Sequence, residues 1–202
     1  MATENNKADN RLFVLNGHPA KTSISQNIVQ AYIEGARQQG FGVREAHLHD
    51  LKFDMDFEYG GYSKVKPLEP ALEEVLQNIE WSTRFVVVTP MWWGGLPAKL
   101  KGLIDRVFLP GRVFDTRGAK GGLPKPLLVG RSAHVIITSD SPWWYFLFWL
   151  HRPLYWQLRR QIFGFVGFKP VRVTHFTGAS HPKPGQVDSW LKQARNLGGQ
   201  RL

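Results

Sequence analysis

Short, continuous runs of apolar residues recur along the chain, and several of them are rich in β-branched side chains. Leu12–Leu15 and Phe85–Val88 contain no polar residue. Runs of this length are typical of strands that are buried on both faces, as the strands of parallel sheets are. Together with less regular runs, they predict five strands, at Leu12–Leu15, Phe41–His47, Phe85–Val88, His134–Thr138 and Val171–Phe176.

Amphipathic segments separate these runs. Their apolar residues recur at helical spacing, which gives each segment one face that can pack on a sheet. The predicted helices cover approximately Ser25–Gln39, Glu69–Ile79, Pro97–Phe108 and Val187–Leu197. Strands that alternate with helices in this way predict an α/β fold, in which a five-stranded parallel sheet is doubly wound as three αβα layers.

Two segments lie outside this alternation. Arg112–Gly130 is rich in glycine, lysine and proline, and we expect it to be an excursion beyond the sheet. Residues 1–10 are polar and lack the apolar core of a signal peptide, so we expect a disordered lead-in. No linker or repeat divides the chain, and 43% apolar content suits one core. Residues 1–202 are therefore predicted to form a single domain.

The loop after the third predicted strand combines two tryptophans with two glycines, in the sequence PMWWGG. In open parallel sheets, ligands bind outside the carboxyl ends of the strands, which is where this loop would lie. Glycines allow a flat ligand to approach the backbone, and indoles can form a wall beside it. Alternatively, Trp92 and Trp93 fill the core and the glycines serve only the turn.

The loop after the first predicted strand is rich in small and hydroxylated residues and leads into a helix. A helix N-terminus with nearby hydroxyls, such as those of Thr22, Ser23 and Ser25, is suited to binding an anion. The loop has neither the glycine spacing of a dinucleotide fold nor that of an NTPase loop. The alternative is that Ser23 or Ser25 only caps the helix.

The stretch from Pro90 to Phe108 resembles the signature of the flavodoxin-like NAD(P)H:quinone oxidoreductases. That signature reads approximately P-x-x-W-x-x-x-P-A-x-L-K-G-x-x-(D/E)-R-V-F. The resemblance extends from Leu12 to Leu197 and implies the flavodoxin-like form of the doubly wound fold. The matching positions are Pro90, Trp93, Pro97, Ala98, Leu100, Lys101, Gly102, Asp105, Arg106, Val107 and Phe108.

The resemblance also implies which residues bind a flavin. In the family, the loop after the first strand holds the flavin phosphate, and the loops after the third and fourth strands contact the ring. The third of these loops reads Thr-Thr-Gly-Gly in the family, and here Asp140 and Ser141 stand in place of its glycines. The implied flavin-binding residues are His18, Ser23, Ile24, Ser25, Pro90, Met91, Trp92, Trp93, Gly94, Thr138, Ser139, Asp140 and Ser141.

Tyr145 and His151 are the implied catalytic residues. They have the six-residue spacing of a tyrosine–histidine pair in the animal quinone reductases, which stabilises charge on the reduced ring. Aligning Tyr145 requires a one-residue gap after Ser141. A histidine among aromatic residues is more often structural, so this alternative stays open.

The implied function is the two-electron reduction of quinones by NADPH or NADH. In this ping-pong reaction, hydride passes to the flavin and a quinone then stacks on the same ring. The resemblance favours FAD, with FMN as the alternative, and a cytoplasmic enzyme. A second function is also compatible with it, since such folds serve as flavin-binding ancillary subunits that regulate membrane ion-efflux systems.

Composition excludes several other classes. The chain has no cysteine, so disulfides, thiolate metal sites and cysteine nucleophiles are excluded. The net charge of +10 is uneven, with 9 Lys and Arg against 12 Asp and Glu up to residue 89, and 17 against 4 thereafter. No nucleic-acid motif accompanies the basic half, so we expect no nucleic-acid partner. Asp54, Asp56 and Glu58 lack the pattern of a calcium loop and indicate a solvated loop.

An aromatic-rich insertion separates the fourth and fifth strands. Residues 142–168 contain 11 of the 26 aromatic residues. The longest uncharged run, Pro142–Leu150, is too short to span a bilayer. Peripheral contact with a membrane, an oligomer interface and a substrate wall are the three alternatives. We expect part of a homodimer interface, because an exposed patch of this size would be a liability on a monomer.

Overall fold

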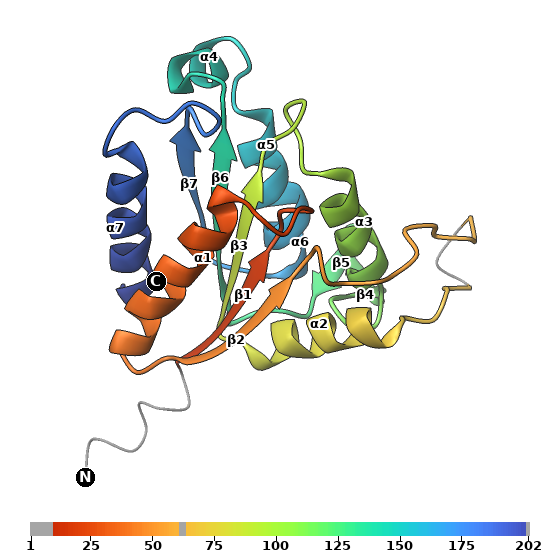
Figure 1. Ribbon diagram of the computed structural model, residues 1–202. Helices are drawn as coiled ribbons and strands as arrows, with labels where there is room; N and C mark the ends of the chain where they lie inside the picture. Colours follow the sequence, from red (N-terminus) through yellow and green to blue (C-terminus); the bar gives the residue numbers. More distant parts are fainter. Residues whose placement is uncertain (1–9, 61–63, 201–202) are drawn as a thin grey trace.

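The computed structural model describes residues 10–60 and 64–200. Its centre is a five-stranded sheet in the order β2-β1-β3-β6-β7, with every neighbouring pair parallel (Figure 1). The predicted fold class and all five strands are confirmed. The strands are β1 Arg11–Asn16, β2 Gly42–His47, β3 Arg84–Pro90, β6 Ser132–Ser139 and β7 Val171–Thr177.

Helices cover both faces of the sheet. Alternate residues of the central strands face opposite layers, so that Phe13 and Phe85 pack on one side and Val14 and Val86 on the other. The layer on Val14 and Val86 consists of α1 and α7, while α2, α3 and the helices of the insertion form the other (Figure 1). The four long helices are α1 Ile24–Gln38, α2 Pro70–Trp81, α3 Ala98–Val107 and α7 Gln186–Gly199.

Helices α1 and α7 approach each other backbone to backbone. A Cβ atom at Gly198 would lie 2.0 Å from the carbonyl oxygen of Tyr32, and one at Gly35 would lie 1.9 Å from that of Arg195. Such distances leave no room for a side chain, so both positions require glycine. The two helices therefore hold each other at a fixed separation.

The insertion forms a series of short helices. Helix α4 stands beyond the carboxyl ends of the strands, whereas the following helices return along the sheet (Figure 1). Phe146, Leu154, Leu158 and Phe163 are buried in the core beneath them. The elements are α4 Trp143–Phe148, α5 Pro153–Trp156, the π-helix η1 Gln157–Ile162 and α6 Phe163–Val166.

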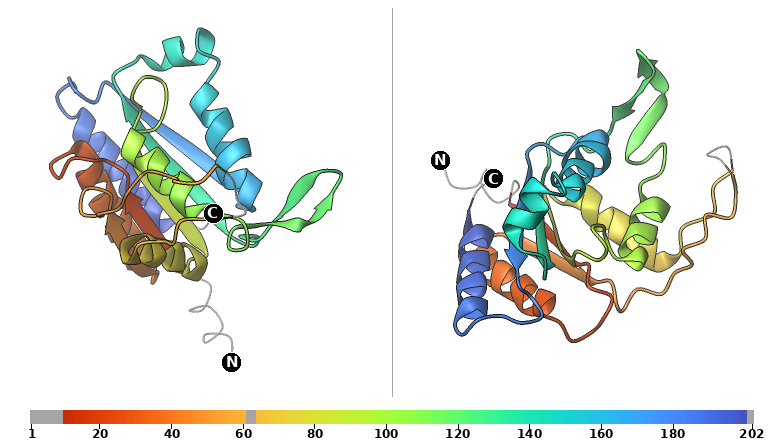
Figure 2. Two further views of the ribbon diagram at one scale, coloured as in Figure 1. Left: turned by 90° about the vertical axis from the view of Figure 1, so that its right-hand side faces the viewer. Right: turned by 90° about the horizontal axis from the view of Figure 1, so that it is seen from above.

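The expected excursion is an antiparallel hairpin of β4 Phe114–Lys120 and β5 Leu123–Pro126. It projects away from the sheet, as both views of Figure 2 show. At its base, the ring of Phe114 meets that of Phe165 edge to face at 5.3 Å. The predicted excursion is thus confirmed. Residues 1–9 of the expected lead-in lie outside the described residues.

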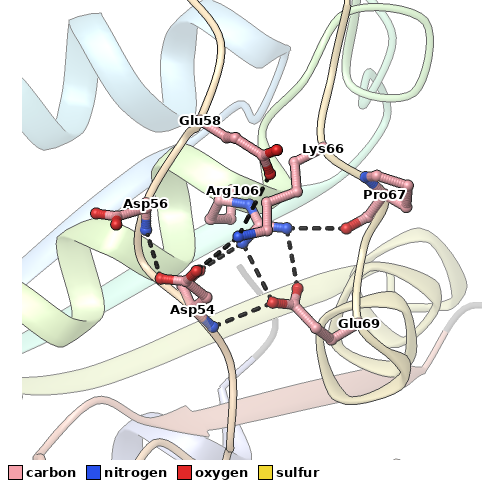
Figure 3. A network of polar contacts seen from close by, with 7 residues as sticks. All are labelled: Asp54, Asp56, Glu58, Lys66, Pro67, Glu69 and Arg106. Atoms are coloured by element: carbon pink, nitrogen blue, oxygen red, sulfur yellow. Dashed lines mark hydrogen bonds and ion pairs between the residues drawn. The ribbon is translucent and has the colours of Figure 1, made fainter.

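Arg106, a residue of the signature, organises the loop that follows β2. Its side chain is buried and donates to the carbonyl oxygen of Asp54 (Figure 3). It also donates to the carbonyl oxygen of Pro67 at 2.9 Å and to the carboxylate of Glu69 at 2.9 Å. Lys66 pairs with Asp54 at 2.6 Å in the same network. The acidic residues of this loop therefore serve structure, and the described residues contain no cluster that could hold a metal ion.

Candidate functional site

Three loops meet at the carboxyl ends of β1, β3 and β6. The N–H of Gly17 donates to the carbonyl oxygen of Val88 at 2.7 Å, and that of Met91 donates to Thr138 at 2.8 Å. Each bond joins the start of a loop to the carboxyl-terminal part of the neighbouring strand. A side chain at Gly17 would crowd its neighbours, because a Cβ atom there would lie 2.8 Å from Cδ2 of Leu100 and 3.2 Å from the carbonyl oxygen of Val88. The sheet thus brings together the three segments predicted to bind one ligand.

The first loop offers two buried hydroxyls without partners. Ser23 occupies the cap position of α1 but makes no side-chain capping bond. The Oγ atoms of Ser23 and Ser25 are buried, and neither has a hydrogen-bond partner among the described residues. The first turn of α1 contains no acidic residue. A capping role alone does not account for these hydroxyls, whereas a phosphate group at the helix N-terminus would satisfy them.

His18 lies in the same loop with one ring nitrogen already used. Its Nδ1 lies 3.0 Å from the backbone nitrogen of Ala20, from which a neutral ring can accept, and 3.3 Å from the carbonyl oxygen of the same residue. The backbone N–H of His18 donates to Asn16 Oδ1 at 3.1 Å. Burial lowers the pKa of His18, and nearby His49 acts in the same direction. A neutral ring that accepts at Nδ1 carries its proton on Nε2. That N–H is then available to an anion.

Trp92 and Trp93 lie outside the core. Trp92 and Gly95 exchange two backbone hydrogen bonds, which close a tight turn over Trp93 and Gly94. Both central residues have positive φ, 53° at Trp93 and 75° at Gly94. Trp93 is fully exposed, while Trp92 is half-exposed and meets the ring of His18 edge to face at 5.8 Å. The alternative that these indoles fill the core is therefore wrong.

Besides Ser25 and Ser139, three of the predicted flavin-binding residues have buried side chains. Pro90 ends β3, Met91 packs in the core, and Thr138 lies near the end of β6. Ile24 is the first residue of α1 and packs against the opposite core cluster. These positions can offer a ligand their main-chain groups, which is the role that the resemblance implies for the loop after β3.

In the third loop, two polar side chains are engaged within the protein. Ser139 Oγ lies 2.7 Å from Nε2 of His175 on β7. The carboxylate of Asp140 accepts from the N–H of Ser180 at 2.7 Å and from its hydroxyl at 2.8 Å. The backbone and side chain of Ser180 hold the pKa of Asp140 below its usual value. Asp140 therefore ties this loop to the one after β7, and Ser141 remains half-buried at its end.

The predicted catalytic pair lies on the insertion. Tyr145 is exposed on α4 and meets the ring of Trp144 edge to face. His151 follows α4 in a left-handed conformation, with φ of 50°. It lines a cleft of about 450 Å³ together with Tyr155 and arginine side chains, and Tyr145 does not line that cleft. The structure thus places both residues near the edge that carries the three loops, without joining them in one cavity.

His175 and Tyr155 were not predicted from the sequence as site residues. His175 contacts the rings of Phe146 at 5.4 Å and Tyr155 at 5.9 Å. Burial lowers the pKa of His175 to about 4 and raises that of Tyr155. Val171 and Val173 alternate with polar residues along β7, and continuing that alternation by two residues places His175 on the face of the insertion.

Another cleft lies away from these loops. It has a volume of about 890 Å³ and lies between α3, the hairpin and η1, with Met55, Phe108, Phe114 and Phe165 in its wall. Phe108 and Phe114 come from the two ends of the segment that links α3 to the hairpin. None of the residues named in its wall is a buried hydroxyl without a partner, as Ser23 and Ser25 are in the first loop.

Comparison with known proteins gives a consistent result. A family model described as flavodoxin-like fold matches residues 10–197. NAD(P)H dehydrogenase (quinone) 1 of Cavia porcellus is 24% identical over 215 residues, which cover 93% of this chain and 77% of that protein. An FMN-dependent NADH:quinone oxidoreductase of Beijerinckia indica is 35% identical over 117 residues, covering 55% of this chain and 53% of that protein.

Among solved structures, the NAD(P)H:quinone oxidoreductase from Methanothermobacter marburgensis superposes with a TM-score of 0.79. It is 21% identical, and the superposition covers 96% of this chain and 99% of that one. At this identity, the likeness shows a common fold. Within residues 10–60 and 64–200, no helix is long and apolar enough to cross a membrane.

Proposed function

We propose a function for this chain that starts from its membership of the flavodoxin-like fold family. The protein is a flavin-dependent oxidoreductase that reduces quinones with electrons from NADH or NADPH. The observation that carries this function is the pair of buried, unpartnered hydroxyls of Ser23 and Ser25 at the N-terminus of α1. They lie at the edge of the sheet where the other two loops converge.

The flavin phosphate would be held by the first loop. The hydroxyls of Ser23 and Ser25, the Nε2–H of His18 and the first N–H groups of α1, beginning at Ile24, can all donate to it. Hydrogen bonds to a charged group contribute about 1.5–3 kcal/mol each. Because the helix dipole adds positive potential at the same point, a dianionic phosphate fits this loop.

The flavin ring would lie between the second and third loops. The bound flavin supplies the redox chemistry, by accepting a hydride from the nicotinamide and passing two electrons to the quinone. Main-chain groups from Pro90 to Gly94 and from Thr138 to Ser141 would contact the ring, with Trp92 and Trp93 beside it. Tyr145 and His151 on the insertion would stabilise negative charge that develops there.

FMN fits better than FAD, which the sequence resemblance favoured. The relative from Beijerinckia indica is named as FMN-dependent. The described site offers one phosphate-binding loop at α1, which suffices for the single phosphate of FMN. Mass analysis of the flavin released from purified protein distinguishes the two: FMN is expected, and FAD would overturn the assignment.

Steady-state kinetics test the reaction. We expect purified, flavin-loaded protein to oxidise NADH or NADPH when a benzoquinone is present, with parallel initial-velocity lines that indicate a ping-pong sequence. The alternative function, a regulatory subunit of an ion-efflux system, is not favoured by relatives named as oxidoreductases. It would be supported by tight flavin binding without turnover.

We further propose that the chain is one flavodoxin-like domain that works in the cytoplasm as a homodimer. The cleft between α3, the hairpin and η1 exposes apolar side chains, including Met55 of the loop after β2 and Phe165 of the insertion. A twofold contact there would bury both copies of the cleft. Light scattering is expected to give the dimer mass, and Phe165→Ser is expected to shift the protein towards monomer.

A further inference from the structure

The outer surface of α4 and α5 is apolar, and the proposed reaction assigns no role to most of it. Phe146, Leu154 and Leu158 turn inward and are buried. Six of the twelve exposed large hydrophobic side chains among the described residues nevertheless lie between residues 144 and 156. Trp149 is 71% exposed and Trp156 is 61% exposed. The exposed set is Trp144, Tyr145, Phe148, Trp149, Leu150 and Trp156.

Arginines border these aromatic residues. Arg152, Arg159 and Arg160 are exposed, and none forms an ion pair with an acidic side chain of the described chain. The guanidinium of Arg160 lies 5.0 Å from the ring centre of Trp156. All three arginines line the same 450 Å³ cleft as Trp156. The surface therefore presents unneutralised positive charge directly beside exposed indoles.

The insertion itself contributes no negative charge. Residues 141–187 contain six Lys and Arg and no Asp or Glu. If this surface met its own copy across a twofold axis, arginine would face arginine, which is unfavourable. An apolar partner without charge would leave the arginines unpaired. The complementary occupant is therefore anionic and able to accept aromatic side chains.

The surface is also placed for contact with something large. Helix α4 stands beyond the carboxyl ends of the strands, at the top of the view (Figure 1). The view from above also shows α4 apart from α1 and α7 (Figure 2). At this edge of the molecule, a short helix thus presents exposed Trp144 and Phe148, and exposed Trp149 follows it directly.

We propose that α4, α5 and η1 bind the surface of an anionic lipid bilayer, with the exposed aromatic side chains in the headgroup region and the arginines on lipid phosphates. Tryptophan is favoured at the membrane interface because its ring has both apolar area and a polar N–H. Basic residues near an anionic leaflet add affinity that salt weakens. The inference goes beyond the proposed reaction, because binding a bilayer requires neither flavin nor nicotinamide.

Sedimentation with vesicles tests the proposal on the full-length wild-type protein. Vesicles of phosphatidylcholine alone are compared with vesicles that also contain phosphatidylglycerol, at low and high salt. We expect binding to the anionic vesicles, with little binding to the neutral ones and a loss at high salt. Quenching of tryptophan fluorescence by brominated lipid should accompany binding, because the indoles would enter the bilayer.

Matched variants separate the two contributions. Phe148→Ser with Trp149→Ser should abolish sedimentation, whereas Leu123→Ser with Val129→Ser, which removes exposed apolar side chains elsewhere, should not. Arg159→Gln with Arg160→Gln should weaken partitioning onto anionic vesicles roughly 30-fold, about fivefold for each arginine. The control Arg37→Gln with Lys192→Gln, on the layer of α1 and α7, should have little effect.

The proposal is overturned if the wild-type protein does not sediment with anionic vesicles or if brominated lipid leaves its fluorescence unchanged. It is also overturned if Phe148→Ser with Trp149→Ser converts a dimer to monomer while the wild-type protein ignores vesicles, since the surface would then be a subunit interface. Preference for single-stranded nucleic acid over lipid would have the same consequence. None of these outcomes depends on quinone turnover.

Discussion

Ser139 Oγ lies 2.7 Å from Nε2 of His175, and this contact joins the end of β6 to β7 beneath the insertion. Ser139 is buried and His175 is half-buried, and the rings of Phe146 and Tyr155 pack against the histidine. The contact fixes the position of the third loop, because Ser139 is the last residue of its strand. The protonation state of His175 is therefore coupled to the structure of the site.

We expect stability to fall as the pH decreases from about 6.5 to about 4. Burial lowers the pKa of His175 from 6.5 to about 4, so the unfolded chain binds this proton more readily than the folded protein does in that range. His134 has a similarly lowered pKa and adds to the effect. Urea unfolding at several pH values should show a shallower decline for His175→Gln. Ser139→Ala, which keeps the titrating ring, should retain the slope.

Replacing Ser23 and Ser25 together with alanine should weaken flavin retention. Two charge-assisted hydrogen bonds contribute about 1.5–3 kcal/mol each, so the loss of both predicts a decrease in affinity of at least 100-fold. Equilibrium titration with FMN measures it. Ser189→Ala, in the first turn of α7, is the matched control and should bind normally. Unchanged flavin content in the double variant would contradict the phosphate assignment.

Trp93→Asn should stabilise the protein and impair its activity. A left-handed backbone conformation costs about 1–2 kcal/mol for an ordinary residue and less for asparagine, and the fully exposed indole contributes little packing in return. We expect a higher midpoint of thermal unfolding together with a higher KM for quinone, because a wall of the site is lost. A variant with unchanged kinetics would remove Trp93 from the site.

Arg106→Leu should destabilise the fold. Removing one partner of a buried ion pair typically costs about 3–5 kcal/mol, and this guanidinium also satisfies the carbonyl oxygens of Asp54 and Pro67. Chemical denaturation should show the loss. Glu69→Gln, which keeps a hydrogen-bond acceptor at the more exposed end of the pair, should cost less. Equal costs would indicate that the backbone contacts of Arg106 contribute nothing.

The central strands β1, β3 and β6 could be predicted because they are buried on both faces, which leaves a continuous apolar run in the sequence. Phe85–Val88 is such a run, and it lies at the centre of the observed sheet. The signature in α3 indicated the family but not the task of Arg106. That role depends on backbone carbonyl groups of a distant loop. Because every residue has such a group, the residue types do not reveal which carbonyls Arg106 binds.

The insertion could not be resolved by the same reasoning. Phe146 is buried and Phe148 is 65% exposed, although both are phenylalanines two positions apart on one short helix. Hydrophobicity does not distinguish a side chain that packs on the sheet from one that faces outward. The contact of Ser139 with His175 was missed for another reason: it links residues 36 positions apart, and only the pairing of β6 with β7 brings them together.

The close approach of α1 and α7 makes the first loop depend on the last helix. Gly35 and Gly198 allow the two backbones to touch, and α1 begins at the proposed phosphate site. No residue of α7 is assigned to that site, yet α7 sets where α1 lies on the sheet. A bulky residue at Gly198 would therefore move the N-terminus of α1, so cofactor affinity is encoded in part by the final residues of the chain.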